Sequence, residues 1–143
     1  MKRIIAIATL LLISPTHASN PASFTDAQIM SMSASVVVEQ ANHMQKFCKE
    51  FSPKNDLTQS VAILTKHRDK VYKVTNSPEL ETLKEHSLNQ LKVYTIRFRA
   101  QGSEALLCGG LQDNWVKTTE EQFKLMAKEA FPQVKAMLAS QAK

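Results

Sequence analysis

The sequence predicts an all-α protein, a single-domain four-helix bundle of up-down topology that carries one disulfide. Two observations lead to this class. Glycine is scarce, with three residues in 143, and such a composition disfavours the many tight turns of β-sandwiches and barrels. Apolar residues also recur at steps of three and four, which is the period of a helix and not of a strand.

Residues 1–18 have the layout of a cleavable secretory signal. A basic start at Met1-Lys2-Arg3 precedes an apolar run of ten residues, Ile4 to Ile13, and Thr16-His17-Ala18 offers small residues for cleavage. The run is too short to span a bilayer. We therefore expect the mature chain to be residues 19–143, one helical domain, located in the periplasm or alternatively secreted. Because no cysteine lies near the cleavage site, we do not expect a lipidated N-terminus.

The charge of the mature chain is modest. The formal net charge of +5 falls by two, to +3, when Lys2 and Arg3 leave with the signal. This charge favours solubility and argues against a nucleic-acid partner. No second apolar run is long enough for a transmembrane segment.

Two helices are expected in the first half of the mature chain. The first is capped by Thr25 or Asp26 and runs to Phe51, where Ser52-Pro53 ends it. Its apolar stripe is Met30, Ala34, Val37, Ala41, Met44, Cys48 and Phe51. The second runs from Asp56 to about Thr75, and its apolar face is Leu57, Val61, Leu64, Val71 and Val74.

The third helix is expected to be the longest, from Pro78 to about Leu107, with Ser77 as its cap. Residues spaced three or four apart along it, most of them apolar, are Leu80, Leu83, Ser87, Leu91, Tyr94, Phe98, Gln101, Ala105 and Cys108. Gly102-Ser103 is a possible break, and Gly109-Gly110 is expected to stop the helix.

Leu111 to Lys117 is expected to connect the third and fourth helices, and it contains the only tryptophan, Trp115. A capping box then starts the fourth helix, formed by Thr118 with Glu121 or by Thr119 with Gln122. The apolar face of this helix is Phe123, Ala127, Ala130, Val134, Met137 and Leu138. Pro132 lies well inside and is expected to kink the helix or split it in two.

Cys48 and Cys108 are expected to form a disulfide. Both lie on apolar stripes, and in an up-down bundle the first and third helices run parallel, so their C-terminal ends meet. An oxidising compartment favours the bond over two buried thiols. The alternatives are two free cysteines or an intermolecular bridge.

No catalytic, metal or cofactor site is expected. Gly-x-Ser-x-Gly and Cys-x-x-Cys motifs are absent, and the pair Glu39 and His43 supplies only half a metal site. Met30 and Met32 with His43 and Met44 suggest soft copper ligands, but Met30 and Met32 point in opposite directions on a helix. A carrier of a small ligand, haem or copper in the bundle is kept as an alternative function.

The densest basic stripe is the candidate partner-binding surface. It contains Lys66, Lys70 and Lys73 with Arg68 beside them, and it would dock an acidic partner or anionic lipid or cell-wall groups. Trp115 either closes the end of the bundle or is exposed as an anchor for the same partner. A solvated helix face without a partner is the simpler interpretation of the stripe.

The plan from Asp26 to Cys108 loosely resembles the small helical pilotins of type II secretion, in which a first helix ends near a cysteine that pairs with a later one. No specific motif carries the resemblance, and the segment after Trp115 has no counterpart in it. The resemblance implies a non-enzymatic protein of accessory or chaperone type that docks on another envelope or secreted protein. An inhibitor of immunity type, which blocks a periplasm-acting toxin or lytic enzyme, is the alternative.

Overall fold

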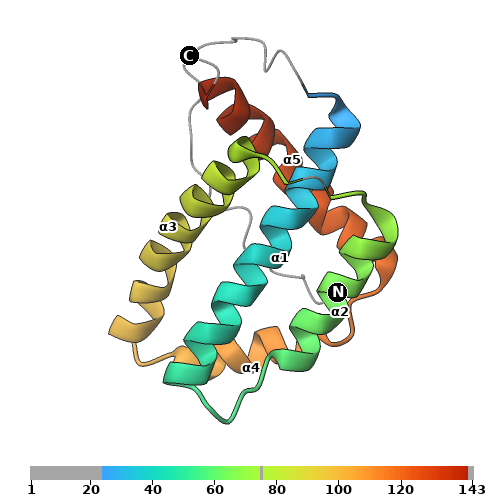
Figure 1. Cartoon of the computed structure of the whole chain (residues 1–143). Helices are drawn as coiled ribbons and strands as arrows, with labels where there is room; N and C mark the ends of the chain where they lie inside the picture. The colour runs from blue at the N-terminus through green and yellow to red at the C-terminus, as the bar shows by residue number, and fades with distance from the viewer. Residues whose placement is uncertain (1–23, 75, 142–143) are drawn as a thin grey trace.

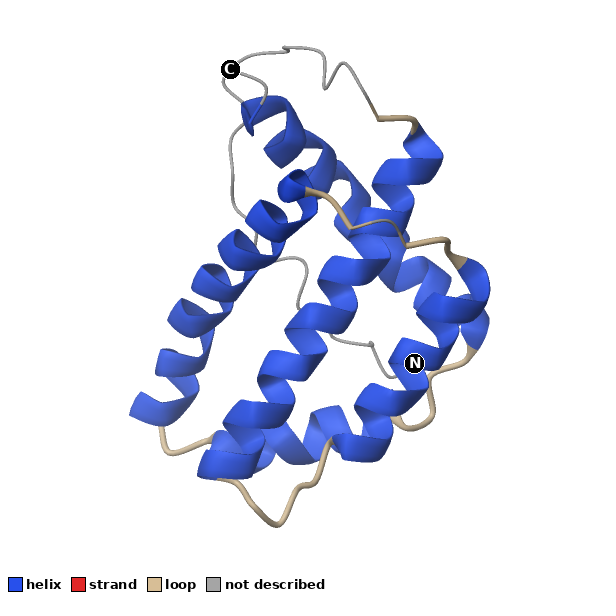
Figure 2. Cartoon of the chain, in the orientation of Figure 1, coloured by secondary structure: helices blue, strands red, loops and turns tan. Residues whose placement is uncertain are grey.

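The structure, a computed structural model, describes residues 24–74 and 76–141, and these residues are helical with no strand among them (Figure 2). The helices are α1 (Asp26–Phe51), α2 (Thr58–Val71), α3 (Pro78–Ala100), α4 (Glu104–Trp115) and α5 (Glu120–Gln141). Figure 1 shows that α1 and α3 run in the same direction and that α2, which connects them along the chain, runs in the opposite direction. Helix α4 lies across the lower end of the molecule in this view. The all-α class is therefore confirmed, but the described chain has five helices instead of four. The expected signal segment, residues 1–18, lies outside the described residues.

Helix α1 is the centre of the molecule, because it contacts all four other helices. The predicted stripe is buried or partly buried, but burial extends well beyond it. The additional buried residues of α1 are Ile29, Met32, Ser33, Ser35, Val36, Val38, Gln40 and Phe47. A helix with neighbours on several sides buries more than one stripe. The predicted stripe was therefore too narrow for a central helix.

Three helix starts agree with the sequence. Thr25 and Gln28 form a reciprocal capping box at α1. The Ser77 hydroxyl accepts a hydrogen bond from the first turn of α3, directly before Pro78. At α5 the capping box is the one between Thr119 and Gln122, with distances of 2.9 and 3.2 Å. Side-chain oxygens thus satisfy backbone N–H groups that have no partner inside the helix.

The predicted third helix does not continue to Leu107, because the break considered at Gly102-Ser103 is present and α3 ends before it. Gly102 has a φ of +63°, the left-handed conformation that glycine adopts without strain. The N–H of Ser103 donates to Phe98 O at 2.9 Å and that of Gly102 donates to Arg99 O at 3.1 Å. These two bonds form a Schellman motif, which ends a helix and turns the chain. As a consequence Gln101 and Ala105 are exposed instead of lying on a buried stripe.

The expected stop at Gly109-Gly110 is wrong, because both residues lie inside α4. The segment from Leu111 to Trp115 is likewise helix, not a connection. Gly102 is the glycine with a positive φ, so the pair at 109 and 110 keeps a helical backbone. The third predicted helix is thus two helices, α3 and α4, that meet at Gly102.

The remaining differences concern α2 and α5. Helix α2 ends at Val71 instead of near Thr75, and Val74 of its predicted face is 37% exposed. Helix α5 continues through Pro132 without being split. Its predicted apolar face is buried as expected. No described helix has both the length and the apolar character that crossing a membrane requires.

The disulfide between Cys48 and Cys108 is present, and both residues are fully buried, with their Cα atoms 5.8 Å apart. The pairing is confirmed, but its expected geometry is not. Cys108 lies within α4 and not at the end of α3, so the bond attaches α4 across the end of α1. The bond thus holds the helix that closes this end of the bundle.

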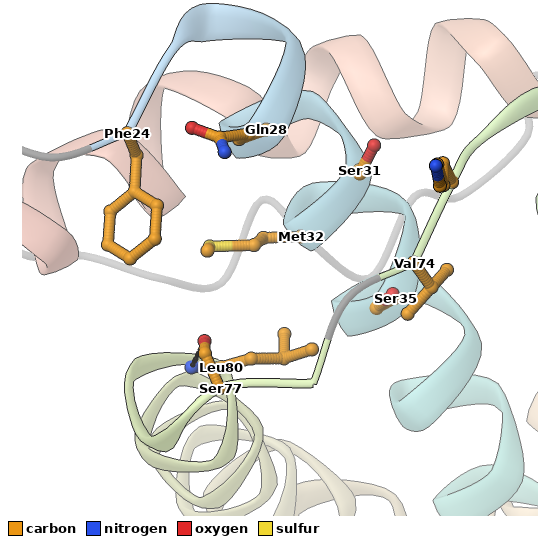
Figure 3. Close-up of a pocket in the computed structure, with 9 residues that line it drawn as sticks. Phe24, Gln28, Ser31, Met32, Ser35, Val74, Ser77 and Leu80 are labelled. Carbon is orange, nitrogen blue, oxygen red and sulfur yellow. Dashed lines mark hydrogen bonds between the residues drawn. The ribbon is translucent and has the colours of Figure 1, made fainter.

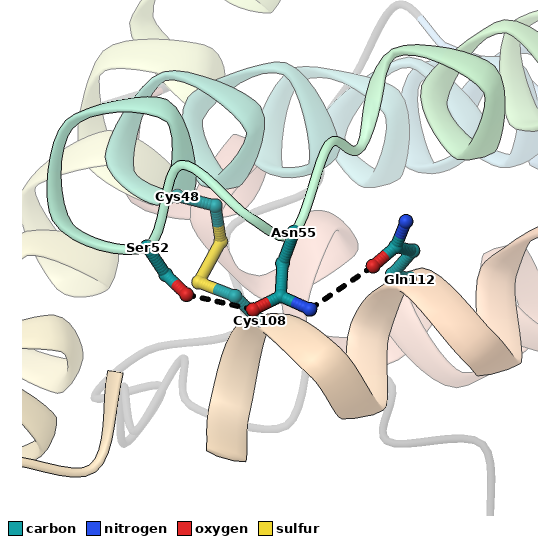
Figure 4. Close-up of a disulfide and its surroundings, with 5 residues drawn as sticks. All are labelled: Cys48, Ser52, Asn55, Cys108 and Gln112. Carbon is teal, nitrogen blue, oxygen red and sulfur yellow. Dashed lines mark hydrogen bonds between the residues drawn. A yellow bond between two sulfur atoms is a disulfide. The ribbon is translucent and has the colours of Figure 1, made fainter. Parts of the chain in front are cut away.

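Hydrogen bonds beside the disulfide attach the α1–α2 loop to α4 (Figure 4). The Ser52 hydroxyl donates to Asn55 Oδ1 at 2.7 Å, and Asn55 Nδ2 donates to Gln112 Oε1 at 3.1 Å. The Ser60 hydroxyl, at the start of α2, donates to the Gln112 carbonyl oxygen at 3.3 Å. Asn55 is therefore the link between the loop and α4.

Replacing Asn55 by alanine is expected to lower the free energy of unfolding by about 1–2 kcal/mol, because it leaves the partly buried Gln112 and Ser52 groups without a partner. Urea denaturation followed by circular dichroism measures the change. Lys54→Ala, at the exposed neighbouring position, is the matched control and should be nearly neutral. Equal stabilities of the two variants would contradict this role for Asn55.

Candidate functional site

The predicted basic stripe lies on α2 and on the chain that follows it. Lys66 and Lys70 are exposed on the helix, and Lys73 is exposed just beyond its end. Arg68 is partly buried, with a side chain that is 22% exposed. Lys66 and Lys70 thus share α2, whereas Lys73 lies on the chain after the helix, so the predicted stripe does not lie on a single helix.

Two of the four cations of the stripe have carboxylate partners. Arg68 Nε lies 2.9 Å from Asp69 Oδ1, and Lys70 Nζ lies 2.7 Å from Glu120 Oε2 on α5. The hydrogen bond from Lys70 holds the pKa of Glu120 below its usual value. Within the described residues, Lys66 and Lys73 have no ion pair, so they are the cations that remain for a partner. Partner binding by this stripe stays a prediction.

Two aromatic residues near the stripe face inward. The Nε2–H of His67 donates to the Thr118 carbonyl oxygen at 2.8 Å, and the ring lies 6.2 Å from that of Phe123. Trp115 is 2% exposed and belongs to the main apolar cluster. This burial agrees with a residue that closes the end of the bundle. An anchor for a partner would require the Trp115 side chain to leave the core.

A small pocket lies beside Lys73, between the start of α1 and the start of α3 (Figure 3). Its volume is about 70 Å³. The apolar part of its lining is Phe24, Met32, Val74 and Leu80, and the polar part is Gln28, Ser31, Ser35, Lys73 and Ser77. Of these residues, only Lys73 was a partner-binding candidate in the sequence, since the lining residues come together only in the folded chain.

The outer face of α3 carries an apolar surface that was not predicted from the sequence. Val93 is 58% exposed and Ile96 is 64% exposed, one turn apart on the helix. The cations Lys92 and Arg97 are exposed next to them. Beyond the turn at Gly102, Leu106 of α4 is 79% exposed. A signal was available in the sequence, because Val93 and Ile96 fall outside the buried stripe of α3 while being strongly apolar.

The candidate metal ligands do not form a site in the described residues. Among residues 24–74 and 76–141, no group of three His, Cys, Asp or Glu side chains is arranged to hold a metal ion. Met30 packs against the main cluster and Met32 against the smaller one, so they face different directions, as predicted. Burial, and then the charges of Lys92 and Lys46, lower the pKa of His43, while Glu39 acts in the opposite sense.

Comparison with known proteins gives no relative for this chain. No protein-family model, no curated protein and no solved structure matches it.

Proposed function

We propose that the mature chain is a non-enzymatic protein of the periplasm that docks on another envelope or secreted protein, in an accessory or chaperone role. The observation that carries the proposal is the apolar surface on the outer face of α3, centred on Val93 and Ile96. Single exposed apolar residues are common, whereas exposed apolar side chains that lie next to one another, as Val93 and Ile96 do, are candidates for a protein-binding surface.

The energetics of this surface favour a partner. Fully burying one Val or Ile side chain stabilises a complex by about 1.5–3 kcal/mol, and these two side chains are still more than half exposed. Lys92 and Arg97 border the apolar pair and would steer an acidic partner toward it. The face therefore combines an apolar centre with a basic rim, which is the usual arrangement of a docking surface.

The pocket beside Lys73 supports binding more than catalysis. Its polar lining consists of hydroxyl, amide and ammonium groups, and its described lining contains no carboxylate or imidazole. General acid–base catalysis most often uses such groups in pairs, near a reacting atom. We therefore place the function in recognition.

Site-specific photo-cross-linking tests the proposal. A benzophenone amino acid at position 96 is expected to form one dominant adduct with a periplasmic protein in living cells. The matched control is position 125 on α5, where Leu125 is 57% exposed. In addition, the double change Val93→Ser and Ile96→Ser should weaken binding to the isolated partner by about tenfold or more, since it removes the apolar contact.

Equal cross-linking at positions 96 and 125, or none at 96, would contradict docking through α3. The identity of the adduct separates the accessory role from the immunity-type alternative. A component of a secretion or envelope assembly supports the first role. A lytic enzyme or toxin supports the second.

A further inference from the structure

The pocket between α1 and α3 contains a buried hydroxyl group that has no partner. Ser35 is 1% exposed, and its Oγ forms no hydrogen bond within the described residues. Two other serines of the same helix behave differently. Ser31 Oγ donates to Ala27 O at 3.2 Å, and Ser33 Oγ donates to Ile29 O at 2.8 Å. A serine in a helix can normally satisfy its hydroxyl this way, so the unsatisfied group at Ser35 points to a missing partner.

The other polar groups of the pocket have hydrogen-bond donors to offer. Gln28 Oε1 already accepts from the N–H of Thr25 at 2.8 Å, which leaves the Gln28 amide nitrogen available. Ser77 Oγ already accepts from the N–H of Leu80 at 3.1 Å, which leaves its hydroxyl hydrogen available. Lys73 adds an ammonium group with no carboxylate partner among the described residues. The pocket therefore suits a ligand that accepts hydrogen bonds and carries negative charge.

The size and the walls of the pocket restrict this ligand further. Its volume of about 70 Å³ is roughly half that of an engineered protein cavity which holds benzene. Phe24, Met32, Val74 and Leu80 supply apolar walls (Figure 3). Leu80 is fully buried, whereas Val74 is 37% exposed, so the pocket has an apolar floor and an open side. An aliphatic group of about three or four carbons fits this space.

We propose that this pocket binds a short aliphatic carboxylate, with the carboxylate between the Lys73 ammonium and the Ser35 hydroxyl and the aliphatic group against Met32 and Leu80. A free short-chain acid has this chemistry, and so does the C-terminal residue of a polypeptide that ends in a small aliphatic side chain. The inference does not depend on docking through α3, because the two sites share no residue.

Titration of the folded protein followed by NMR tests the proposal, with sodium isobutyrate as the probe. Isobutyrate is expected to give saturable shifts of the amide signals of Ser35 and Leu80. Isobutyramide has nearly the same shape without the charge and should bind about tenfold more weakly, because it cannot form charge-assisted hydrogen bonds. Equal affinity of the two probes, or no saturable shift with isobutyrate, would overturn the proposal.

Variants locate the two contacts. Lys73→Met should weaken isobutyrate binding by about tenfold, and Ser35→Ala should weaken it several-fold. Lys66→Met removes an exposed lysine of the same stripe that does not line the pocket, so it should leave the affinity unchanged. If Ser35→Ala impairs folding, Lys73→Met decides the outcome alone, since Lys73 is exposed. If Lys66→Met and Lys73→Met weakened isobutyrate binding equally, the effect would come from general surface charge, and the proposed site would be wrong.

A pair of short peptides distinguishes the two sources of the carboxylate. Both end in valine, one with a free C-terminal carboxylate and one with an amide. If the free-acid peptide binds more tightly than isobutyrate and shifts the same amide signals, the pocket is assigned to a polypeptide C-terminus. Binding of isobutyrate alone assigns it to a free short-chain acid.

Discussion

Replacing Cys48 and Cys108 together by alanine is expected to lower the free energy of unfolding by about 4 kcal/mol. The two cysteines are 60 residues apart, and in the chain-entropy model a cross-link that closes a loop of this length destabilises the unfolded state by that amount. Both residues are fully buried, so alanine also leaves some core volume unfilled. The melting temperature should fall by roughly 15 °C.

Removal of the disulfide should destabilise α4 before the other helices. This helix has 12 residues, too few to be stable alone in water, and it is attached to α1 by the disulfide. In the alanine variant, hydrogen exchange should show reduced protection in α4 before the rest of the molecule opens. The Asn55–Gln112 hydrogen bond remains and should keep the loop near α4 in part.

Thermal unfolding with and without a reducing agent separates the bond from the substitution. The wild-type protein should lose most of the same stability when reduced, whereas the alanine variant should not respond to reduction. An unreduced wild-type protein with the stability of the variant would contradict the structural role of the bond.

The starts of the helices could be predicted from sequence because they depend on a few neighbouring residues. Thr25 with Gln28, Ser77 before Pro78, and Thr119 with Gln122 each satisfy backbone N–H groups locally. The disulfide pairing could also be predicted from the sequence. The chain has two cysteines, both on predicted helix stripes, so each has one possible partner within the chain.

The helix ends were harder to predict from the sequence, because they depend on which glycine adopts a left-handed conformation. Gly102, Gly109 and Gly110 each look like a stop, but Gly102 is the one with a positive φ. The spacing of three and four residues continues past Gly102 to Cys108, so periodicity suggested one helix where the structure has two. Gly102 marks the break locally, but the position of α4 across the end of α1 is a tertiary arrangement that periodicity does not contain.

The candidate site was predicted only in part, because exposure and pairing are tertiary properties. The spacing of Lys66 and Lys70 was enough to place both on one helix, but not to show that α2 ends before Lys73 or that Glu120 of α5 pairs with Lys70. Trp115 was left open between two roles, and its burial favours the structural one. The pocket beside Lys73 could not have been found from spacing, since α1, α3 and the chain between α2 and α3 all contribute to it.

Replacing Phe123 by alanine is expected to lower the free energy of unfolding by about 3–5 kcal/mol, the usual range for a fully buried phenylalanine. Phe123 lies in the main apolar cluster at the start of α5. Its ring centroid is 6.3 Å from that of Tyr72 and 6.2 Å from that of His67, so it joins α5 to the C-terminal end of α2. The change therefore removes packing between two helices as well as buried area.

Leu125→Ala is the matched control for this prediction, on the same helix and two residues away. Its side chain is 57% exposed, so the change should alter stability by no more than about 0.5 kcal/mol. Urea denaturation of both variants measures the difference. If both variants lost a similar amount of unfolding free energy, the packing of Phe123 would not be what holds α5 against α2. A large loss at Phe123 alone, with reduced hydrogen-exchange protection in α2, would show that this ring connects α5 to α2, the helix that carries most of the basic stripe.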